Sequence, residues 1–208
     1  MKKLSTSKQM AINMVAAIVS FLIGTGINFV LAPYLVKELG SETYGFIGLA
    51  NNFVQYATIV TSALNSMSGR FISIEYSKGN IDKASRYFSS VLVADLIIAG
   101  VLLLVSSIIT FNIEFILNVP ENLVDSVKIL FALTFATFII SVITAIFTTA
   151  AFVKNKLYIN SLRDIASNTL KLLLVVILFS FFPAKVYFLA MASLASGIFL
   201  LLTLSLIH

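Results

Sequence analysis

Six long runs with little or no charge divide this 208-residue sequence, and they restrict its fold more than any other feature. A helix needs about 20 mostly apolar residues to cross the hydrocarbon core of a bilayer. Each run is long enough for that, and the connections between runs are short. We therefore predict an all-α integral membrane protein, a single six-transmembrane-helix bundle over residues 1–208, with spans at 10–36, 43–69, 87–112, 129–153, 159–182 and 186–207.

The residues outside these runs are too few for a soluble domain. Charged residues make up 11% of the chain, whereas soluble domains contain about a quarter. The chain has no Cys and its one His is His208, so we expect no metal site and no histidine triad. We expect no enzyme activity and no cofactor. The net charge of +5 does not predict nucleic-acid binding, because the basic residues lie between apolar runs instead of among stacking aromatics.

Basic residues gather on one side of the predicted membrane. Cytoplasmic loops carry an excess of Lys and Arg, and this bias orients membrane proteins. We therefore expect a multi-pass protein of the cytoplasmic membrane with both termini in the cytoplasm. The predicted cytoplasmic side holds Lys2, Lys3, Lys8, Arg70, Lys78, Lys83, Arg86, Lys154, Lys156 and Arg163, and the other side holds Lys37, Lys128 and Lys185.

The longest polar stretch, residues 71–86, contains the turn signal Gly79-Asn80. Asp82 and Arg86 follow it at a spacing of four residues, which favours a helix. We expect a short surface helix here, leading into the third span.

Polar residues follow one face of the second span. Polar and small residues in membrane helices concentrate where helices meet or line water. This stripe has more carboxamides than tight packing requires, so we favour a hydrated cavity wall, with a hydrogen-bonded helix interface as the alternative. The stripe consists of Asn51, Gln55, Thr58, Ser62, Asn65 and Gly69, with Asn52 beside it.

Two other spans carry milder stripes. In the first span, small residues at four-residue steps predict a close neighbour, which we expect to be the second span. In the fourth span the residues are hydroxyls, which can bond back to the carbonyl one turn earlier, so we expect packing there. The first stripe is Ala16, Ser20, Gly24 and Asn28; the second is Thr134, Thr137, Ser141, Thr144 and Thr148.

Asp95 lies deep in the third span, about nine residues or ~13 Å beyond Arg86. An ionised carboxylate at that depth is costly unless it is paired or hydrated. One hypothesis is that Asp95 couples transport to protons or sodium ions. The alternative, equally weighted, is a structural partner for a basic residue.

Arg163, Ser167 and Lys171 recur at four-residue steps on the fifth span, so two cations extend inward along one helical face. Arg70 marks the same edge of the second span. These three cations are candidate ligands for a diphosphate, since guanidinium and ammonium groups both bind phosphate oxygens. The alternative is that each reaches lipid headgroups.

Short motifs in the first third of the chain resemble the Wzx-like polysaccharide flippases of the multidrug, oligosaccharidyl-lipid and polysaccharide exporter superfamily. A linker, Asp82-Lys83-Ala84, and another span follow them. Beyond about residue 90 the resemblance is one of hydropathy and topology. The motifs are Asn28-Phe29, Pro33-Tyr34-Leu35-Val36, Leu39-Gly40, Tyr44-Gly45-Phe46, Leu49-Ala50-Asn51-Asn52 and Ser68-Gly69-Arg70-Phe71.

This resemblance implies an architecture and a function. Members have two six-helix lobes around a substrate cavity, and this chain matches the N-terminal lobe, with the second lobe absent. The implied function is translocation of a lipid-linked polyprenyl-diphosphate oligosaccharide for capsule or other surface polysaccharide. Its partners would be membrane lipid, that substrate, a C-terminal lobe and polysaccharide assembly proteins. The alternatives are a drug or cation exporter of the same superfamily and a non-transporting membrane scaffold.

Overall fold

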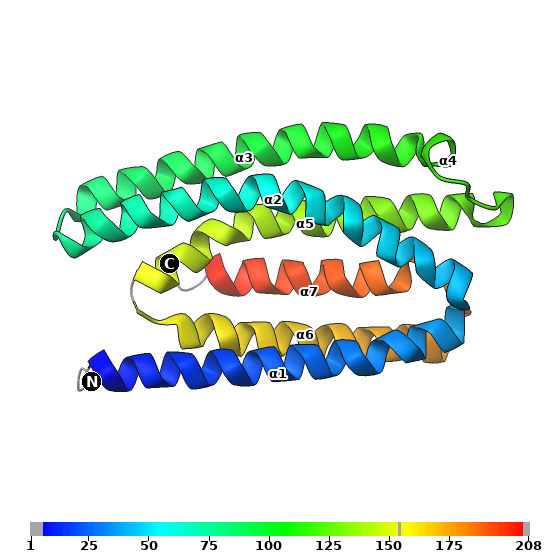
Figure 1. Cartoon of the computed structure of the whole chain (residues 1–208), viewed down its shortest axis with the longest axis horizontal. Helices are drawn as coiled ribbons and strands as arrows, with labels where there is room; N and C mark the ends of the chain where they lie inside the picture. Colours follow the sequence, from blue (N-terminus) through cyan, green and yellow to red (C-terminus); the bar gives the residue numbers. More distant parts are fainter. Residues whose placement is uncertain (1–5, 154, 206–208) are drawn as a thin grey trace.

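The computed structural model describes residues 6–153 and 155–205, and this part of the chain is helical with no strand. It confirms the predicted all-α class. Lys2, Lys3, Lys154 and His208 lie outside the described residues. The elements are α1 (Thr6–Leu39), α2 (Ser41–Ser77), α3 (Ile81–Phe111), α4 (Ile113–Ile116), the 3-10 turn η1 (Glu121–Leu123), α5 (Val124–Val153), α6 (Leu157–Phe181) and α7 (Phe188–Ser205) (Figure 1).

Six of these helices are long, and each covers most of one predicted span. Among the described residues, α1, α3, α5 and α6 are long and apolar enough to cross a membrane. α7 is apolar but shorter, and α2 carries the polar stripe that lowers its hydropathy. The expected turn at Gly79-Asn80 and the helix through Asp82 and Arg86 are present, but a separate short surface helix is wrong, because these residues belong to the start of α3. α2 continues to Ser77, and the chain turns at Gly79, whose φ of 80° favours glycine, directly into α3.

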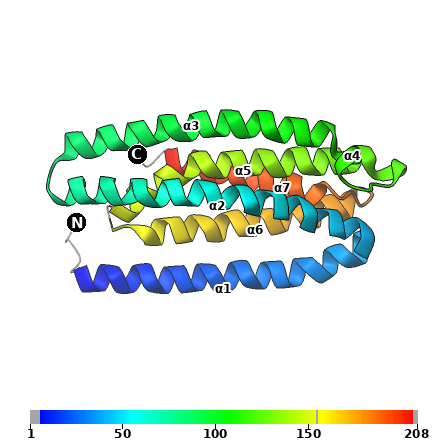
Figure 2. The same ribbon diagram turned by 45° about the horizontal axis from the view of Figure 1, so that its top comes forward.

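The helices form two groups around a shared centre (Figures 1 and 2). α2, α3 and α5 pack together on one side, α1 packs on α6 on the other, and α7 lies between them against α5 and α6. The expected partner of α1 is therefore corrected. Its main neighbour is α6, and a Cβ at Gly24 would lie 3.4 Å from the Asn168 side chain of α6. α1 meets α2 much less because the two helices diverge from their turn at Gly40.

The end of the bundle that holds the α1–α2 turn is closed by apolar side chains, and we call it the packed end. Phe131 is fully buried there, and its ring lies 5.7 Å from that of Phe53 in an edge-to-face arrangement. Phe179 and Phe188 form a similar pair at 5.6 Å. Both groups belong to apolar clusters that share the partly buried Leu39, Tyr44, Tyr187 and Leu189. These contacts join α1, α2, α5, α6 and α7 at the packed end of the bundle, and Ile113 of α4 adds to them.

At the opposite end, where α1 begins and α7 ends, polar contacts accompany the apolar ones, and we call it the polar end (Figure 1). The buried Asn13 of α1 donates to the side-chain oxygen of Asn155 at 2.8 Å and accepts from the backbone N–H of Tyr158 at 3.0 Å. The Asn13 side chain of α1 thus caps the start of α6, because the N-cap residue Lys156 makes no side-chain capping hydrogen bond. Glu75 bonds Asn80 across the α2–α3 turn.

Candidate functional site

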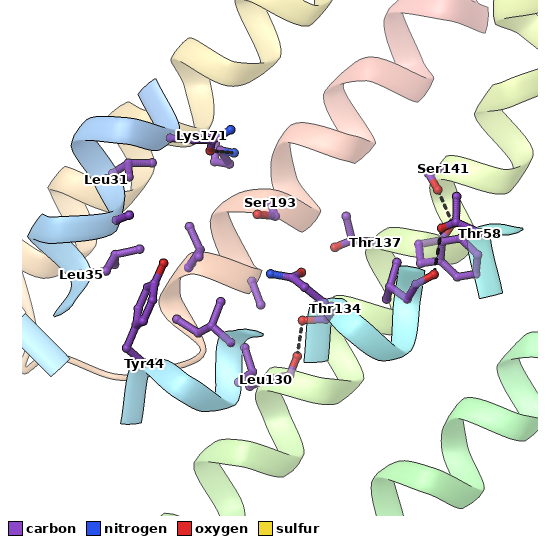
Figure 3. A pocket seen from close by; sticks show the side chains of 18 residues that line it. Leu31, Leu35, Tyr44, Thr58, Leu130, Thr134, Thr137, Ser141, Lys171 and Ser193 are labelled. Atoms are coloured by element: carbon purple, nitrogen blue, oxygen red, sulfur yellow. Dashed lines mark hydrogen bonds between the residues drawn. The ribbon is translucent and has the colours of Figure 1, made fainter. Parts of the chain in front are cut away.

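A cavity of about 570 Å³ lies at the centre of the bundle, next to the packed end. Helices α1, α2, α5, α6 and α7 all contribute side chains to its wall. Leu31, Leu35 and Leu130 are among its apolar lining residues (Figure 3). The polar lining residues are Asn28, Tyr44, Asn51, Thr58, Thr134, Thr137, Ser141, Lys171 and Ser193.

The polar stripe of α2 is shared between two cavities. Asn51 and Thr58 line the central cavity, and Asn65 lines a second cavity nearer the polar end. Asn52, Gln55 and Ser62 are exposed and belong to neither lining. The structure therefore brings the candidates Asn28 and Asn51 together and leaves the other four candidate cavity residues outside the central wall.

α5 contributes more to the cavity than its sequence suggested. Thr134, Thr137 and Ser141 line the wall, so packing is an incomplete interpretation of this stripe, although Thr137 also approaches Gly197 of α7 and Thr144 is buried. The expected bonds to earlier carbonyls are present: Thr134 donates to Leu130 O at 2.8 Å and Ser141 to Phe138 O at 2.7 Å (Figure 3). A hydroxyl whose proton is used in this way keeps its oxygen as an acceptor. The α5 wall is therefore rich in acceptors.

Lys171 is the cation of the central cavity. Its ammonium nitrogen donates to the Asn28 side-chain oxygen on α1 at 3.3 Å (Figure 3). An ammonium group has three donors, and one bond to a neutral carboxamide satisfies a single one of them. No Asp or Glu is among the residues that line this cavity. Lys171 thus leaves positive charge and unused donors facing the central space.

Arg163 has a different environment from Lys171, although both lie on α6. Its guanidinium is buried and donates to the backbone oxygen of Thr203 at 2.7 Å, in the last turn of α7. Carbonyls at a helix C-terminus lack intrahelical partners and favour cations. Ser167, one turn along, donates to Ser196 O of α7. Arg163 therefore holds α7 against α6. It does not line the cavity that contains Lys171.

Arg70 and Asp95 also lie away from the central cavity. Arg70 lines the second cavity, together with Asn65. Asp95 lies on α3, is 2% exposed, and its Oδ2 atom has no hydrogen-bond partner among the described residues. It lines neither the central nor the second cavity. Its proposed coupling role stays a prediction.

Five polar lining residues were not singled out as cavity residues from the sequence: Tyr44, Ser193 and the three α5 hydroxyl residues described above. Tyr44 lies at the base of the cavity, beside the α1–α2 turn (Figure 3). Ser193 is a single hydroxyl in the apolar α7, and no sequence pattern distinguishes it. Thr137 lay in a recognised stripe, but periodicity alone does not say whether a face meets a helix or a cavity. The missing information is which helices are neighbours.

The central cavity combines two kinds of polar group. The hydroxyl oxygens of α2 and α5 accept hydrogen bonds, and the carboxamides of Asn28 and Asn51 both donate and accept. Sugar hydroxyls can pair with such a surface. Lys171 supplies the positive charge that an anionic group requires. The wall therefore suits a polar ligand with one anionic part.

The chain is similar to a curated membrane protein from Bacillus subtilis (strain 168), "Uncharacterized membrane protein EpsK". The two are 33% identical over 187 residues, which is 90% of this chain and 37% of that protein. The chain therefore spans well under half of this relative. No family model matches the sequence, and no solved structure matches the fold. The apolar helices and this relative together identify the chain as an α-helical, multi-pass membrane protein.

Proposed function

We propose that the chain moves a lipid-linked oligosaccharide, a polyprenyl-diphosphate sugar, across the cytoplasmic membrane for capsule or surface polysaccharide, as the N-terminal lobe of a longer flippase. The observation that carries this proposal is the Lys171–Asn28 pair inside a hydroxyl-lined cavity. The ammonium group attracts the diphosphate, and the hydroxyl and carboxamide wall replaces water around the sugars. The process makes and breaks no covalent bond, so it is transport and not enzyme catalysis.

The cost of keeping Lys171 charged supports a functional role. A cation inside a membrane helix is expensive and usually faces a pathway for ions or substrates. Asn28 compensates only part of that cost, because a carboxamide carries no net charge. A bound phosphate would supply both the negative charge and the missing acceptors. The same charge disfavours the cation exporter, since the lining residues include Lys171 and no carboxylate.

Vesicles test this function directly. The chain would be reconstituted into liposomes with a fluorescent lipid-linked oligosaccharide, and quencher accessibility would report movement between leaflets. The longer Bacillus subtilis relative would form a parallel arm. We expect Lys171→Gln to slow translocation at least about tenfold, since a charge-assisted hydrogen bond contributes ~1.5–3 kcal/mol. Lys171→Arg should retain most activity.

Lys185→Gln is the matched control, because Lys185 is an exposed cation that lines neither cavity. Equal rates in the Lys171→Gln, Lys185→Gln and wild-type proteins would overturn the role of Lys171. If the wild-type protein moves no lipid-linked sugar but co-purifies with glycosyltransferases, the scaffold alternative replaces the proposal.

We also propose that the polar end faces the cytoplasm. α1 begins and α7 ends there, and most basic residues lie at that end (Figure 1). The chain has no Cys, so single cysteines can report orientation without background. A membrane-impermeant maleimide on intact cells should label Lys185→Cys and not Ser77→Cys. The reverse pattern would invert the orientation.

A further inference from the structure

A second cavity of about 790 Å³ lies between α2 and α5, nearer the polar end than the central one. Asn65, Gly69, Arg70 and Ser73 line it from α2, and Thr149 lines it from α5. α2 and α5 run in the same direction, so both cavities lie along one helix pair (Figure 2).

The charge of this cavity is positive and uncompensated. Arg70 has an exposed side chain and forms no ion pair with any acid in the described part of the chain. No acidic residue belongs to the lining. The nearest acid along α2 is Glu75, whose oxygens already face Lys78, Lys83 and Asn80. A guanidinium fork without a carboxylate is suited to a phosphate, which it can bind with two parallel hydrogen bonds.

Neutral groups around Arg70 favour the same ligand. The Ser73 hydroxyl is buried and has no hydrogen-bond partner among the described residues, which is costly unless a ligand or water supplies an acceptor. Asn65 adds amide donors. Ile74, Phe152 and Leu157 give the cavity an apolar side. Such a wall suits an amphiphile with a phosphate group on an apolar stem.

Gly69 lines the second cavity where α2 approaches α5 closely. It has no side chain, and a Cβ there would already touch the Thr149 side chain at 3.4 Å. Alanine would fit at that distance, whereas a leucine side chain would fill the cavity. Gly69→Leu therefore blocks the space without changing any charge.

The two cations lie at different depths. Arg70 is about seven residues, or ~10 Å, from the polar end of α2, whereas Lys171 is about 14 residues, or ~21 Å, into α6 from the same end. We propose that the second cavity is a separate phosphate-binding site for a lipid, and that it receives the phosphate before the group reaches Lys171. The second half of this inference rests on the proposed function. The phosphate belongs either to an anionic phospholipid or to a polyprenyl-linked substrate, since both share this chemistry.

Binding measurements on the purified chain in neutral detergent test the site. The probes are a polyprenyl diphosphate, phosphatidylglycerol and the phosphate-free polyprenol, with affinity measured by native mass spectrometry. We expect Arg70→Gln and Gly69→Leu each to weaken polyprenyl-diphosphate binding about tenfold, while Arg70→Lys loses less and Lys185→Gln loses nothing. Polyprenol should bind weakly to every variant. Unchanged binding in both Arg70→Gln and Gly69→Leu, with helicity intact by circular dichroism, would overturn the site.

The two lipid probes separate the sources of phosphate. Tighter binding of polyprenyl diphosphate than of phosphatidylglycerol supports reception of the substrate. Equal affinity for the two lipids would identify the second cavity as a phospholipid headgroup site. It would overturn the proposal that the phosphate of the substrate binds Arg70 before it reaches Lys171. The Lys171→Gln variant should bind at Arg70 normally and translocate the substrate at least about tenfold more slowly than wild type. If wild-type vesicles show no translocation but binding still depends on Arg70, the proposed function fails and the site stands.

Discussion

The two ends of the bundle are held together by different forces. At the packed end, Phe131 packs mainly among apolar side chains, including Phe53 and Phe135. At the polar end, apolar contacts such as that of Phe88 with Phe147 are joined by polar ones, with Asn13 bound to Asn155 and Glu75 bound to Asn80 across the α2–α3 turn. Dispersion contacts at the packed end do not depend on pH or salt, whereas polar contacts compete with water. The difference indicates that the packed end is the fixed part of the bundle, and the polar end is the part that conditions can loosen.

Phe131→Ala should have the largest effect on stability. Its side chain is fully buried among Phe53, Phe135 and Leu130. We expect the free energy of unfolding to fall by about 2–3 kcal/mol, below the ~3–5 kcal/mol of soluble cores, because lipid is as apolar as the core and mainly the cavity term remains. Unfolding in mixed micelles by denaturing detergent measures it. Phe115→Ala is the control, since Phe115 is 84% exposed; equal losses would contradict the comparison.

Asn13→Ala should come next, because it removes the cap that α1 provides to α6. The substitution leaves the Tyr158 N–H and the Asn155 side chain without this partner. We expect a loss of about 1–2 kcal/mol. The same detergent titration measures it, with a cysteine pair across α1 and α6 reporting separation at that end. Asn112→Ala serves as control, since that exposed side chain donates a hydrogen bond to the local Ile108 carbonyl. Equal losses of stability in the two variants would show that the Asn13 cap contributes no more than a local hydrogen bond.

Acidification should loosen the polar end before the packed end. The hydrogen bond from Asn80 is the main cause that lowers the pKa of Glu75 below its usual 4.5, and Lys78 and Lys83 add to it. A lowered pKa in the folded state means that the stabilising contribution is full above about pH 4.5 and is lost as pH falls through the folded value. The protection of the amide hydrogens at the α2–α3 turn, corrected for the intrinsic pH dependence of exchange, should therefore fall in acid. Glu75→Gln should abolish that dependence, and a turn with the same pH response in both proteins would refute it.

The smallest expected effect concerns an ion pair at the packed end. Lys128 and Glu114 lie 2.6 Å apart, and both side chains are partly exposed. Exposed pairs contribute roughly 0.2–1 kcal/mol. Glu114→Gln should therefore lower the free energy of unfolding by no more than about 1 kcal/mol, and high salt should reduce the difference. A larger loss would show that charge, and not packing alone, stabilises this end.

The sequence was sufficient to locate the helices but not to predict which helices pack against each other. The charge-free runs located all six long helices, because in lipid the backbone must bond internally. The continuation of α2 to Ser77 was missed, since a polar segment beyond the bilayer resembles a loop in hydropathy. The structural role of Arg163 depends on its hydrogen bond to Thr203, which is 40 residues away in the sequence. The cavity role of Thr134 depends on the packing of five helices, and no local pattern encodes that.

The pairing of α1 with α6 has a consequence for biosynthesis. Asn13 and its partner Asn155 are 142 residues apart in the chain. Ribosomes add about 5–20 residues per second, so α1 leaves the ribosome roughly 7–30 seconds before the α5–α6 turn exists. During that interval the Asn13 and Asn28 side chains remain without their final protein partners. The newly made first helix must therefore wait in the insertion machinery or the bilayer until later translation completes its binding surface.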